Sequence, residues 1–535
     1  MNVLGISGRI RDAAAAVAVD GQVVAAASED CFTKVQGIGY GQTGGFPTRA
    51  VDACLSTAGL TAADVQQVTL VDDEGTETTS EVVRTIFRTN DLRGPVLIDA
   101  LQADAVQAAA SDASAGAVLV CSTQPPALAA FVRRGDGLAP HGRPVATGRL
   151  LSAAGTLASS LGAGGRDPFH ALDRLSIGGE AEFHDDLAAS IGWQADSGVR
   201  VDEDQLARLL ARVAGQFSGR LSDAASLNVR VQQARRALAA SFTCRVAEIV
   251  RDAASSLCDD IALGSMAFGG AMLANPRLTT ELRRLAGESL SLAPVPELTG
   301  RALGAALSAS SPARESLAGL ALGPAFADAD IKRTLDNCRL DYVYEPDWPR
   351  LLVRTSKMLS QGKVVAWFQG AMGFGPRALG TRSILCDPSN RYARQNMNEY
   401  LRQVPLDEPL PVVFAPQAAA ECLTQPAPSP STVFDAAVRD EWRDRLVAAL
   451  DWRHNVRVHG IHPAQAPELS QLLENHYRRT GVPALIETNL CGPGEPVACT
   501  PRDAVKTMYS SPIDALIIGR FVLMKDYWLL RNNVD

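Results

Sequence analysis

Short apolar runs joined by tight turns dominate the first part of the chain. Residues 3–7 and 13–19 are apolar or small, and the Asp-Gly pair at 20–21 favours a hairpin turn into a third strand over 22–28. A strand over 117–122 followed by a second hairpin pattern repeats this order further along. Such a repeat predicts two α/β lobes of similar build.

The remainder of the chain divides at a proline-containing stretch. Residues 201–260 carry apolar side chains at helical spacing. Residues 341–350 contain two prolines and predict a linker, so we expect a first domain over 1–340 and a second over 350–535. The second domain alternates helices and strands and includes a Pro/Ser loop over 424–432.

The most distinctive stretch is GKVVAWFQGAMGFGPRALGTRSILCDPSN, residues 362–390. A buried-strand run over 364–368 leads into a glycine-rich turn and then to Arg377, Arg382 and Ser383. Glycines let the backbone approach a ligand, and each arginine offers a planar donor fork for phosphate or carboxylate. These residues predict either a turn that binds an anion or a purely structural turn with two solvated arginines.

The sequence FGPRALGTRSIL within this stretch resembles the signature of the O-carbamoyltransferase family, which includes the tobramycin and nodulation-factor carbamoyltransferases. RRTGVPALIETNLCGPGEPVACTPRDAV (478–505) and IDALIIGRFVL (513–523) agree, as does the start of the chain. The resemblance implies a two-lobed actin-like (duplicated ribonuclease-H-like) N-terminal domain and a smaller α/β C-terminal domain. In that family the small domain makes carbamoyl-adenylate from carbamoyl phosphate and ATP, and the large domain transfers the carbamoyl group to a hydroxyl.

The resemblance also implies an iron-type metal, held by histidines and aspartates beside the nucleotide. The corresponding positions in this chain carry Arg11, Ala100, Leu101, Asp104, Ser122 and Leu298. Imidazole and carboxylate are the ligands such a site requires, and the single carboxylate Asp104 does not hold a divalent ion alone. We therefore expect no bound metal, with Arg11 as a fixed positive charge in its place.

The C-terminal domain departs from the family pattern as well. The family's phosphate contacts would fall between residues 398 and 414, where Arg402 is the only cation and acids lie nearby. A phosphate pocket there would have lost most of its electrostatic attraction. The family's Ser-x-Asn contact becomes Asn489-Leu490-Cys491, whereas Arg377, Arg382, Ser383, Thr488 and the Gly-Glu-Pro at 494–496 still match.

Three further candidates remain open. Gly269, Gly270 and Gly304, with Thr488, are compatible with a bound ATP, since the family places these stretches beside the nucleotide. Cys491 lies in a Gly-Pro loop and is a candidate nucleophile, although no histidine is adjacent in sequence to activate it. The histidines at 454, 459 and 462 suggest a metal only weakly, because their spacing fixes no ligand geometry.

Composition narrows the class of protein. The 535 residues are 46% hydrophobic and 21% charged, with a net charge of -8, as in an ordinary globular chain with room for two cores. The acidic balance argues against nucleic-acid binding, and no run reaches the ~18 apolar residues of a membrane span. Ten cysteines without a C-x-x-C pair favour reduced thiols and a cytoplasmic location.

Two hypotheses of function follow. Under the first, the chain is a catalytically degenerate carbamoyltransferase of natural-product biosynthesis that forms a homo- or heterodimer, partnering an active paralogue. Loss of ligands in both domains supports it. Under the second, the chain is a stand-alone, metal-independent enzyme that transfers carbamoyl or a related acyl group to a small-molecule acceptor. Its site would use Arg377, Arg382, Asn489 and Cys491.

Overall fold

The computed structural model describes most of the chain in two compact units. The first unit combines residues 1–103 with 298–535, and the second spans 104–297. The described residues are 1–72, 76–87, 95–112, 114–135, 137–165, 167–215, 224–258, 261–287, 290–309, 317, 319–425, 433–461 and 463–525. The expected Pro/Ser loop falls largely outside them, because 426–432 are not described, and so does His462.

The first unit opens with a five-stranded sheet in the order β3-β2-β1-β4-β5. Its strands are β1 (Asn2–Ser7), β2 (Ala14–Val19), β3 (Gln22–Ser28), β4 (Gln67–Val71) and β5 (Val96–Ile98). Strand β1 pairs antiparallel with β2 and parallel with β4. The hairpin predicted from the Asp-Gly turn is therefore confirmed.

Helices cover this sheet where small residues permit close approach. Helix α2 (Thr48–Ala58) contacts β2 and β3, and α11 (Arg301–Leu307) lies on β1. A Cβ added at Gly5 would stand 2.3 Å from the backbone nitrogen of Ala306, so only glycine lets α11 pack so closely on β1. Helices α3 (Thr76–Ile86) and α4 (Ala100–Ser111) complete this part of the chain.

The second unit repeats the same strand order. Its sheet runs β12-β11-β6-β7-β8. The strands are β6 (Ala117–Thr123), β7 (Pro126–Arg134), β8 (Gly137–Ala146), β11 (Met266–Gly269) and β12 (Ser291–Leu292). Strand β6 pairs antiparallel with β7 and parallel with β11, as β1 does with its two neighbours. Two sheets of one topology confirm the predicted two-lobed, duplicated actin-like fold.

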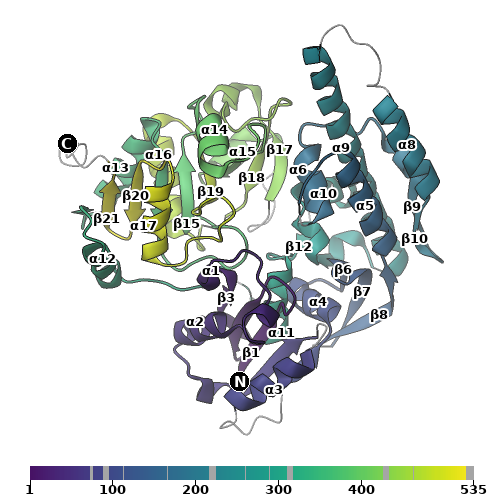
Figure 1. Ribbon diagram of the computed structural model, residues 1–535, viewed down its shortest axis with the longest axis horizontal. Coiled ribbons are helices and arrows are strands. Elements are labelled where there is room, and N and C mark those ends of the chain that lie inside the picture. The colour runs from purple at the N-terminus through teal and green to yellow at the C-terminus, as the bar shows by residue number, and fades with distance from the viewer. Residues whose placement is uncertain are drawn as a thin grey trace. The chain divides into compact units, whose positions relative to one another are not determined.

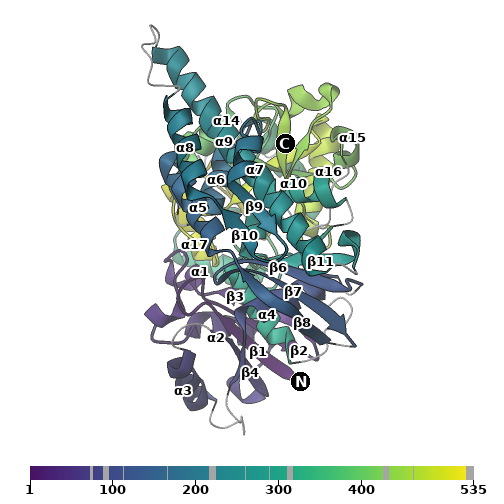
Figure 2. The same cartoon turned by 90° about the vertical axis from the view of Figure 1, so that its right-hand side faces the viewer.

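A group of helices packs on one face of the second sheet (Figure 2). They are α5 (Gly148–Ser160), α6 (Pro168–Ser176), α7 (His184–Ser190), α8 (Glu203–Gly215), α9 (Ala224–Leu257) and α10 (Pro276–Ala286). A small hairpin, β9 (Ile191–Gln194) and β10 (Gly198–Val201), precedes α8. The helical spacing over 201–260 thus becomes two helices, of which α9 is the longest described in the chain. Among the described residues, no helix is long and apolar enough to cross a bilayer.

A nine-stranded mixed sheet forms the C-terminal part of the first unit, in the order β13-β21-β20-β14-β15-β19-β16-β18-β17 (Figure 1). Its strands are β13 (Val343–Tyr344), β14 (Val365–Phe368), β15 (Arg382–Cys386), β16 (Pro411–Phe414), β17 (Val433–Ala437), β18 (Asn455–His459), β19 (Ala484–Asn489), β20 (Ala515–Ile518) and β21 (Phe521–Met524). The stretch 341–350 contributes β13 to this sheet, where the ring of Tyr344 packs on Phe521.

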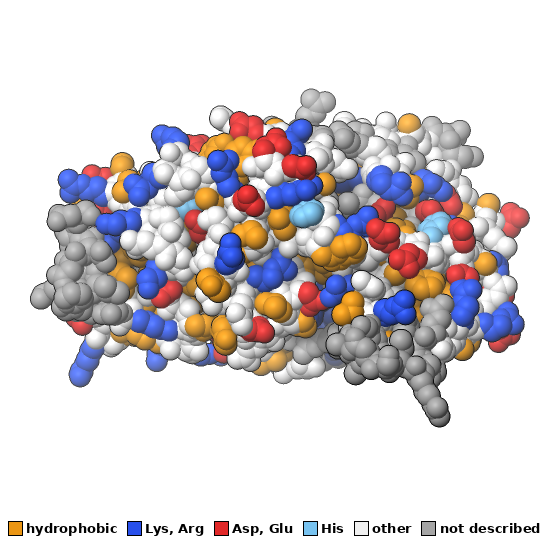
Figure 3. All heavy atoms as spheres, turned by 90° about the horizontal axis from the view of Figure 1, so that it is seen from above, with side chains coloured by type: hydrophobic (Ala, Val, Ile, Leu, Met, Phe, Trp, Pro, Cys, Tyr) orange, Lys and Arg blue, Asp and Glu red, His pale blue; other side chains and the backbone are white. Residues whose placement is uncertain are grey.

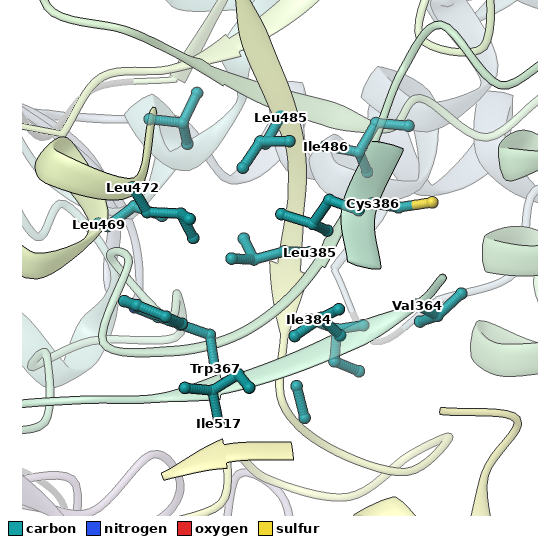
Figure 4. Packing of buried hydrophobic residues seen from close by; sticks show 14 of the residues in the cluster. Val364, Trp367, Ile384, Leu385, Cys386, Leu469, Leu472, Leu485, Ile486 and Ile517 are labelled. Carbon is teal, nitrogen blue, oxygen red and sulfur yellow. The ribbon is translucent and has the colours of Figure 1, made fainter. Parts of the chain in front are cut away.

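The core of the C-terminal part lies between the sheet and its helices. Helices α13 (Trp348–Ser360) and α16 (Pro467–Thr480) pack together, and α12 (Asp328–Asn337) contacts α17 (Pro501–Ser510). Leu469 and Leu472 of α16 face Leu385 and Leu485 of the central strands (Figure 4). The buried run over 364–368 predicted from the sequence is therefore a central strand. On the face shown in Figure 3, basic and acidic side chains are interspersed with apolar ones.

Candidate functional site in the C-terminal domain

Arg382, the first residue of β15, is completely buried. Its Nη1 atom donates to the carbonyl oxygens of Gln369 (2.8 Å) and Thr381 (2.9 Å). Its Nη2 atom donates to those of Pro324 and Gly370, both at 3.1 Å. Four backbone carbonyls therefore accept the hydrogen bonds of the guanidinium, which the sequence analysis had expected to bind an anion.

An aromatic ring also lies against the guanidinium of Arg382. The guanidinium carbon lies 3.6 Å from the centre of the Phe368 ring, and burial lowers the pKa of Arg382 to about 9. The side chain remains a cation at neutral pH, held by carbonyl dipoles and the ring rather than by a counter-charge. Arg382 is therefore neither solvated nor turned toward solvent, and its geometry is that of a structural residue.

The glycine-rich turn before Arg382 pairs with another segment of the first unit. Backbone hydrogen bonds of 2.7 to 3.1 Å join residues 320–324 to Met372 and Phe374. On its other side the same segment bonds to Ala26 of β3 at 3.0 Å. A Cβ at Gly323 would lie 3.0 Å from the carbonyl oxygen of Met372, which explains the glycine there. Residues 320–324 thus connect β3 of the first lobe to the glycine-rich turn.

A second buried group lies on the opposite face of β15. The hydroxyl of Ser383 donates to Glu487 Oε1 at 2.6 Å, and the backbone N–H of Gly380 reaches the same oxygen at 3.2 Å. The Nδ1 atom of His459 lies 2.7 Å from Glu487 Oε2. These bonds join Ser383, His459 and Glu487, and each of the three is at most 4% exposed. We call them the buried network.

Neighbouring groups outweigh burial in setting the pKa of Glu487. Burial raises its pKa, but the neighbouring His459, the Ser383 hydroxyl and the Gly380 N–H together lower it, and the net pKa lies below its usual range. The Nε2 atom of His459 is buried and has no hydrogen-bond partner among the described residues. Sequence reasoning missed Glu487. A glutamate inside the apolar strand run ALIETN was the available signal.

Asn489 fixes the turn at residues 376–380, which we call the signature turn. Its Oδ1 accepts from the Ala378 N–H at 2.8 Å, and its Nδ2 donates to the Pro376 carbonyl at 2.7 Å. Arg377 lies between these two bonds and is half-buried. The structure therefore places Arg377 in a turn that Asn489 holds through its backbone, while Arg382 is buried in the core.

Cys491 is half-buried and not activated. Burial raises the pKa of its thiol to about 11, Arg402 opposes this, and Glu495 adds to it. A thiol with that pKa is almost wholly protonated at neutral pH and is a poor nucleophile. The hydroxyl of Thr488 is buried without a hydrogen-bond partner in the described part of the chain. It lies on the strand face opposite to Glu487 because neighbouring side chains alternate.

Arg402, the one cation of the 398–414 stretch, faces groups of its own chain. It ends a short π-helix, Asn396–Arg402. Its Nη1 donates to Asn398 Oδ1 at 2.8 Å, and its Nη2 lies 4.0 Å from Glu408 Oε1. An acidic neighbour at this separation offsets much of the charge that a phosphate would meet.

The positions implied for a metal do not fit one. The Nε atom of Arg11 lies 2.7 Å from Asp12 Oδ2, so its charge is paired with a carboxylate. Over the part of the chain that the structure describes, no three His, Cys, Asp or Glu side chains converge as metal ligands. A guanidinium carries no lone pair for a metal, and Ala100 and Leu101 have no donor atom. The residues present do not fit the family's iron.

The three glycines proposed for a nucleotide each have a packing role. A Cβ at Gly304 would lie 1.9 Å from the Ala103 carbonyl oxygen. One at Gly269 would lie 3.0 Å from the Cβ of Ala108. Gly270 has φ +94°, and its Cβ would approach the Cys121 carbonyl oxygen to 2.5 Å. Close packing therefore accounts for all three, and their contact with ATP remains a prediction.

Comparison with known proteins shows which families and proteins the chain is similar to. Residues 356–525 match the family model "Carbamoyltransferase C-terminus". A protein of Synechocystis is 29% identical over 328 residues, covering 54% of this chain and 52% of its own length. Nodulation protein NolO of Bradyrhizobium diazoefficiens is 28% identical over 253 residues, covering 44% and 45%. The chain thus spans about half the length of these curated relatives.

A solved structure, component A of the (R)-2-hydroxyglutaryl-CoA dehydratase of Acidaminococcus fermentans, aligns at 15% identity. It covers 57% of this chain and 96% of its own, with a TM-score of 0.36. The fold assignment rests instead on the duplicated strand order, which defines a two-lobed actin-like α/β protein followed by a C-terminal domain. Residues 356–525 thus match the C-terminal domain of the carbamoyltransferases, and nodulation proteins are similar to the chain over part of its length.

Proposed function

We propose that this chain is a non-catalytic member of the carbamoyltransferase family. It would act in the cytoplasm as one subunit of a dimer with an active paralogue that carbamoylates a small natural product. The observation that supports the proposal is that two arginines of the C-terminal domain are already bonded to groups of the protein. Arg382 is held by four carbonyls, and Arg402 is bonded to Asn398 and faces Glu408.

Carbamoyl phosphate and ATP are polyanions, so making carbamoyl-adenylate requires cations that face the substrates. Moving Arg382 to a ligand would break four hydrogen bonds and leave four carbonyls without this donor. Arg402 would have to exchange Asn398 for phosphate beside a carboxylate. The substituted metal positions in the first lobe support the same conclusion, since the transfer step would lack its metal as well.

The test is carbamoyl-phosphate-dependent release of pyrophosphate from ATP by the purified chain. An intact family member provides the positive control, and a reaction without carbamoyl phosphate provides the background. We expect no release above background. Release at a rate comparable to the positive control would overturn the proposal and favour the stand-alone enzyme. Arg377→Ala and Asn489→Ala would then abolish release if those residues form its site.

The subunit role needs its own experiment. The chain and an active paralogue from the same genome would be mixed and their masses measured by light scattering during gel filtration. A complex containing both chains, with carbamoyl transfer that depends on the paralogue's intact histidines, supports the proposal. Separate elution of the two proteins together with unchanged activity of the paralogue contradicts it.

A further inference from the structure

Five large apolar side chains are exposed on two neighbouring parts of the C-terminal domain. They are Tyr392, Tyr400, Leu406, Val447 and Trp452, and we call the surface that they share the aromatic surface. Three of them are aromatic, with exposed fractions between 59% and 65%. Rings of this size are strongly stabilised by burial, so several that lie near one another in water indicate a contact with another molecule.

Tyr392 and Tyr400 belong to the exposed side of one helical stretch. Residues 393–402 are helical throughout, first as a short α-helix and then as the π-helix that ends at Arg402. Between the tyrosines, Gln395 Nε2 donates to Glu399 Oε2 at 2.7 Å, and both of these side chains are exposed. The exposed side of the stretch therefore carries a tyrosine ring at each end.

Two loops pack beside this helical stretch. Arg394 Nε donates to the carbonyl oxygen of Ala448 at 2.9 Å, which holds the loop over 447–452 beside the start of the stretch. Asn398 Nδ2 donates to the carbonyl oxygen of Leu406 at 3.0 Å, which holds a second loop beside its other end. These loops carry the remaining three apolar side chains, so all five surround the same ten residues.

The two ends of the aromatic surface carry opposite charges. Arg391 and Arg453 are exposed and adjoin the first tyrosine and the tryptophan in the sequence, and the Arg453 guanidinium carbon lies 5.7 Å from the centre of the tryptophan ring. Glu399 and Asp407 are exposed and adjoin the second tyrosine and the leucine. A second copy related by a two-fold axis therefore sets the acidic end of its own surface against the basic end of the first.

We propose that two copies of this chain associate through the aromatic surface, about a two-fold axis that crosses the helical stretch. The charges favour a second copy as the occupant, because a single surface supplies both the cations and the acids that the contact pairs. Aromatic residues and arginine are enriched at interfaces and lysine is depleted, and the segments 388–408 and 447–454 contain no lysine.

The exposed apolar area is large enough for such a contact. At ~150–250 Å² for each aromatic side chain, the three rings leave roughly 300–450 Å² in water. That is about half of the ~800 Å² that each partner buries in a stable interface. The two aliphatic side chains and the charged residues at both ends add to this area.

The inference goes beyond the proposed function, because the side chains of the aromatic surface are not those on which that function rests. In a complex with an active paralogue, the contact would join two such complexes, so that the assembly contains two copies of each chain. Measurements on this chain alone test the contact and leave the paralogue aside.

The mass of the purified chain in solution tests the proposal. Gel filtration with light scattering over a range of protein concentrations should give twice the mass of one chain, with dissociation only on dilution. Tyr392→Ala and Trp452→Ala should each raise the dissociation constant about tenfold or more, because buried aromatic side chains contribute much of the affinity of an interface. Tyr509→Ala is the matched control, since it removes an exposed tyrosine of α17, and it should leave the dissociation constant unchanged.

Charge reversal tests the two-fold arrangement. Arg391→Glu and Glu399→Arg should each weaken association, because each change sets like charges against each other across the axis. The two changes together restore opposite charges and should return the dissociation constant to within about threefold of that of the wild type. A double variant that associates no more tightly than either single variant would contradict the two-fold pairing.

The wild type decides the question even where a variant fails to fold. A mass of one chain at every concentration would overturn the proposal and leave the aromatic surface to a different partner or to none. A dimer that both Tyr392→Ala and Trp452→Ala leave equally tight would overturn it as well, since the two copies would then meet elsewhere.

Discussion

Strand β15 and the signature turn belong to one continuous segment, yet the structure uses them differently. In β15, Arg382 and Ser383 are buried on opposite faces, and every bond described for their side chains goes to the protein. In the turn, Arg377 is half-buried between two hydrogen bonds made by Asn489. Matching a family motif therefore says little about the role of each residue in it, since part of the motif holds the fold together.

The largest expected effect is a loss of stability on removing Arg382, which tests its structural role in β15. Arg382→Ala should lower the free energy of unfolding by roughly 3–5 kcal/mol, because four carbonyls lose their donor inside the core. Urea unfolding followed by circular dichroism measures this. Arg377→Ala is the comparison variant in the turn and should lower stability by less than Arg382→Ala does, because Arg377 is only half-buried. Equal effects of the two variants would erase the distinction between strand and turn.

The buried network should give the next largest effect. Glu487→Gln should cost about 1–3 kcal/mol at pH 7, because the amide cannot accept from all three donors that now face the carboxylate. Glu495→Gln, at a partly exposed ion pair with Lys506, is the matched control. It should change stability by less than about 1 kcal/mol.

The pH dependence of Glu487 has a definite sign. Its pKa is lowered in the folded protein, so the carboxylate stabilises the fold above its usual pKa of 4.5. That contribution is lost as the pH falls through the lower folded value. The difference in unfolding free energy between wild type and Glu487→Gln should therefore be constant near neutrality and shrink below about pH 4.5. A difference that grows on acidification would reverse the assignment.

A smaller effect is expected at Arg402. Glu408→Gln removes the carboxylate that faces its guanidinium at 4.0 Å, so inorganic pyrophosphate should bind about two- to fivefold more tightly than to wild type. Calorimetric titration at low salt measures the change. Glu408→Gln combined with Arg402→Ala should lose the gain. An unchanged affinity in Glu408→Gln would show that the acid does not limit anion binding.

The smallest effect concerns Cys491. With a pKa near 11, its thiol should react slowly with iodoacetamide at pH 7 and about tenfold faster with each added pH unit. Peptide mapping after timed alkylation, with urea-unfolded protein as the reference, provides the measurement. Reaction faster in the folded than in the unfolded chain would restore Cys491 as a candidate nucleophile.

Local patterns predicted many of the elements correctly. The hairpin of β2 and β3 and the strands β1, β6 and β14 lie where period and turn residues indicated, because each depends on neighbouring residues. Glu487 was missed and Arg382 was read as solvated or ligand-binding. Their partners lie far along the chain, Ser383 being 104 positions from Glu487 and Pro324 being 58 from Arg382.

The sequence by itself indicated the resemblance to carbamoyltransferases and the repeated hairpin pattern, and it predicted which residues stand at the metal positions that the resemblance implies. These depend on which side chains are present and on short-range spacing. Only the tertiary structure decided which arginine is buried in the core and which carboxylate anchors β15. Burial and pairing arise when distant segments pack together, and the same arginine is a ligand or a structural residue according to what that packing places beside it.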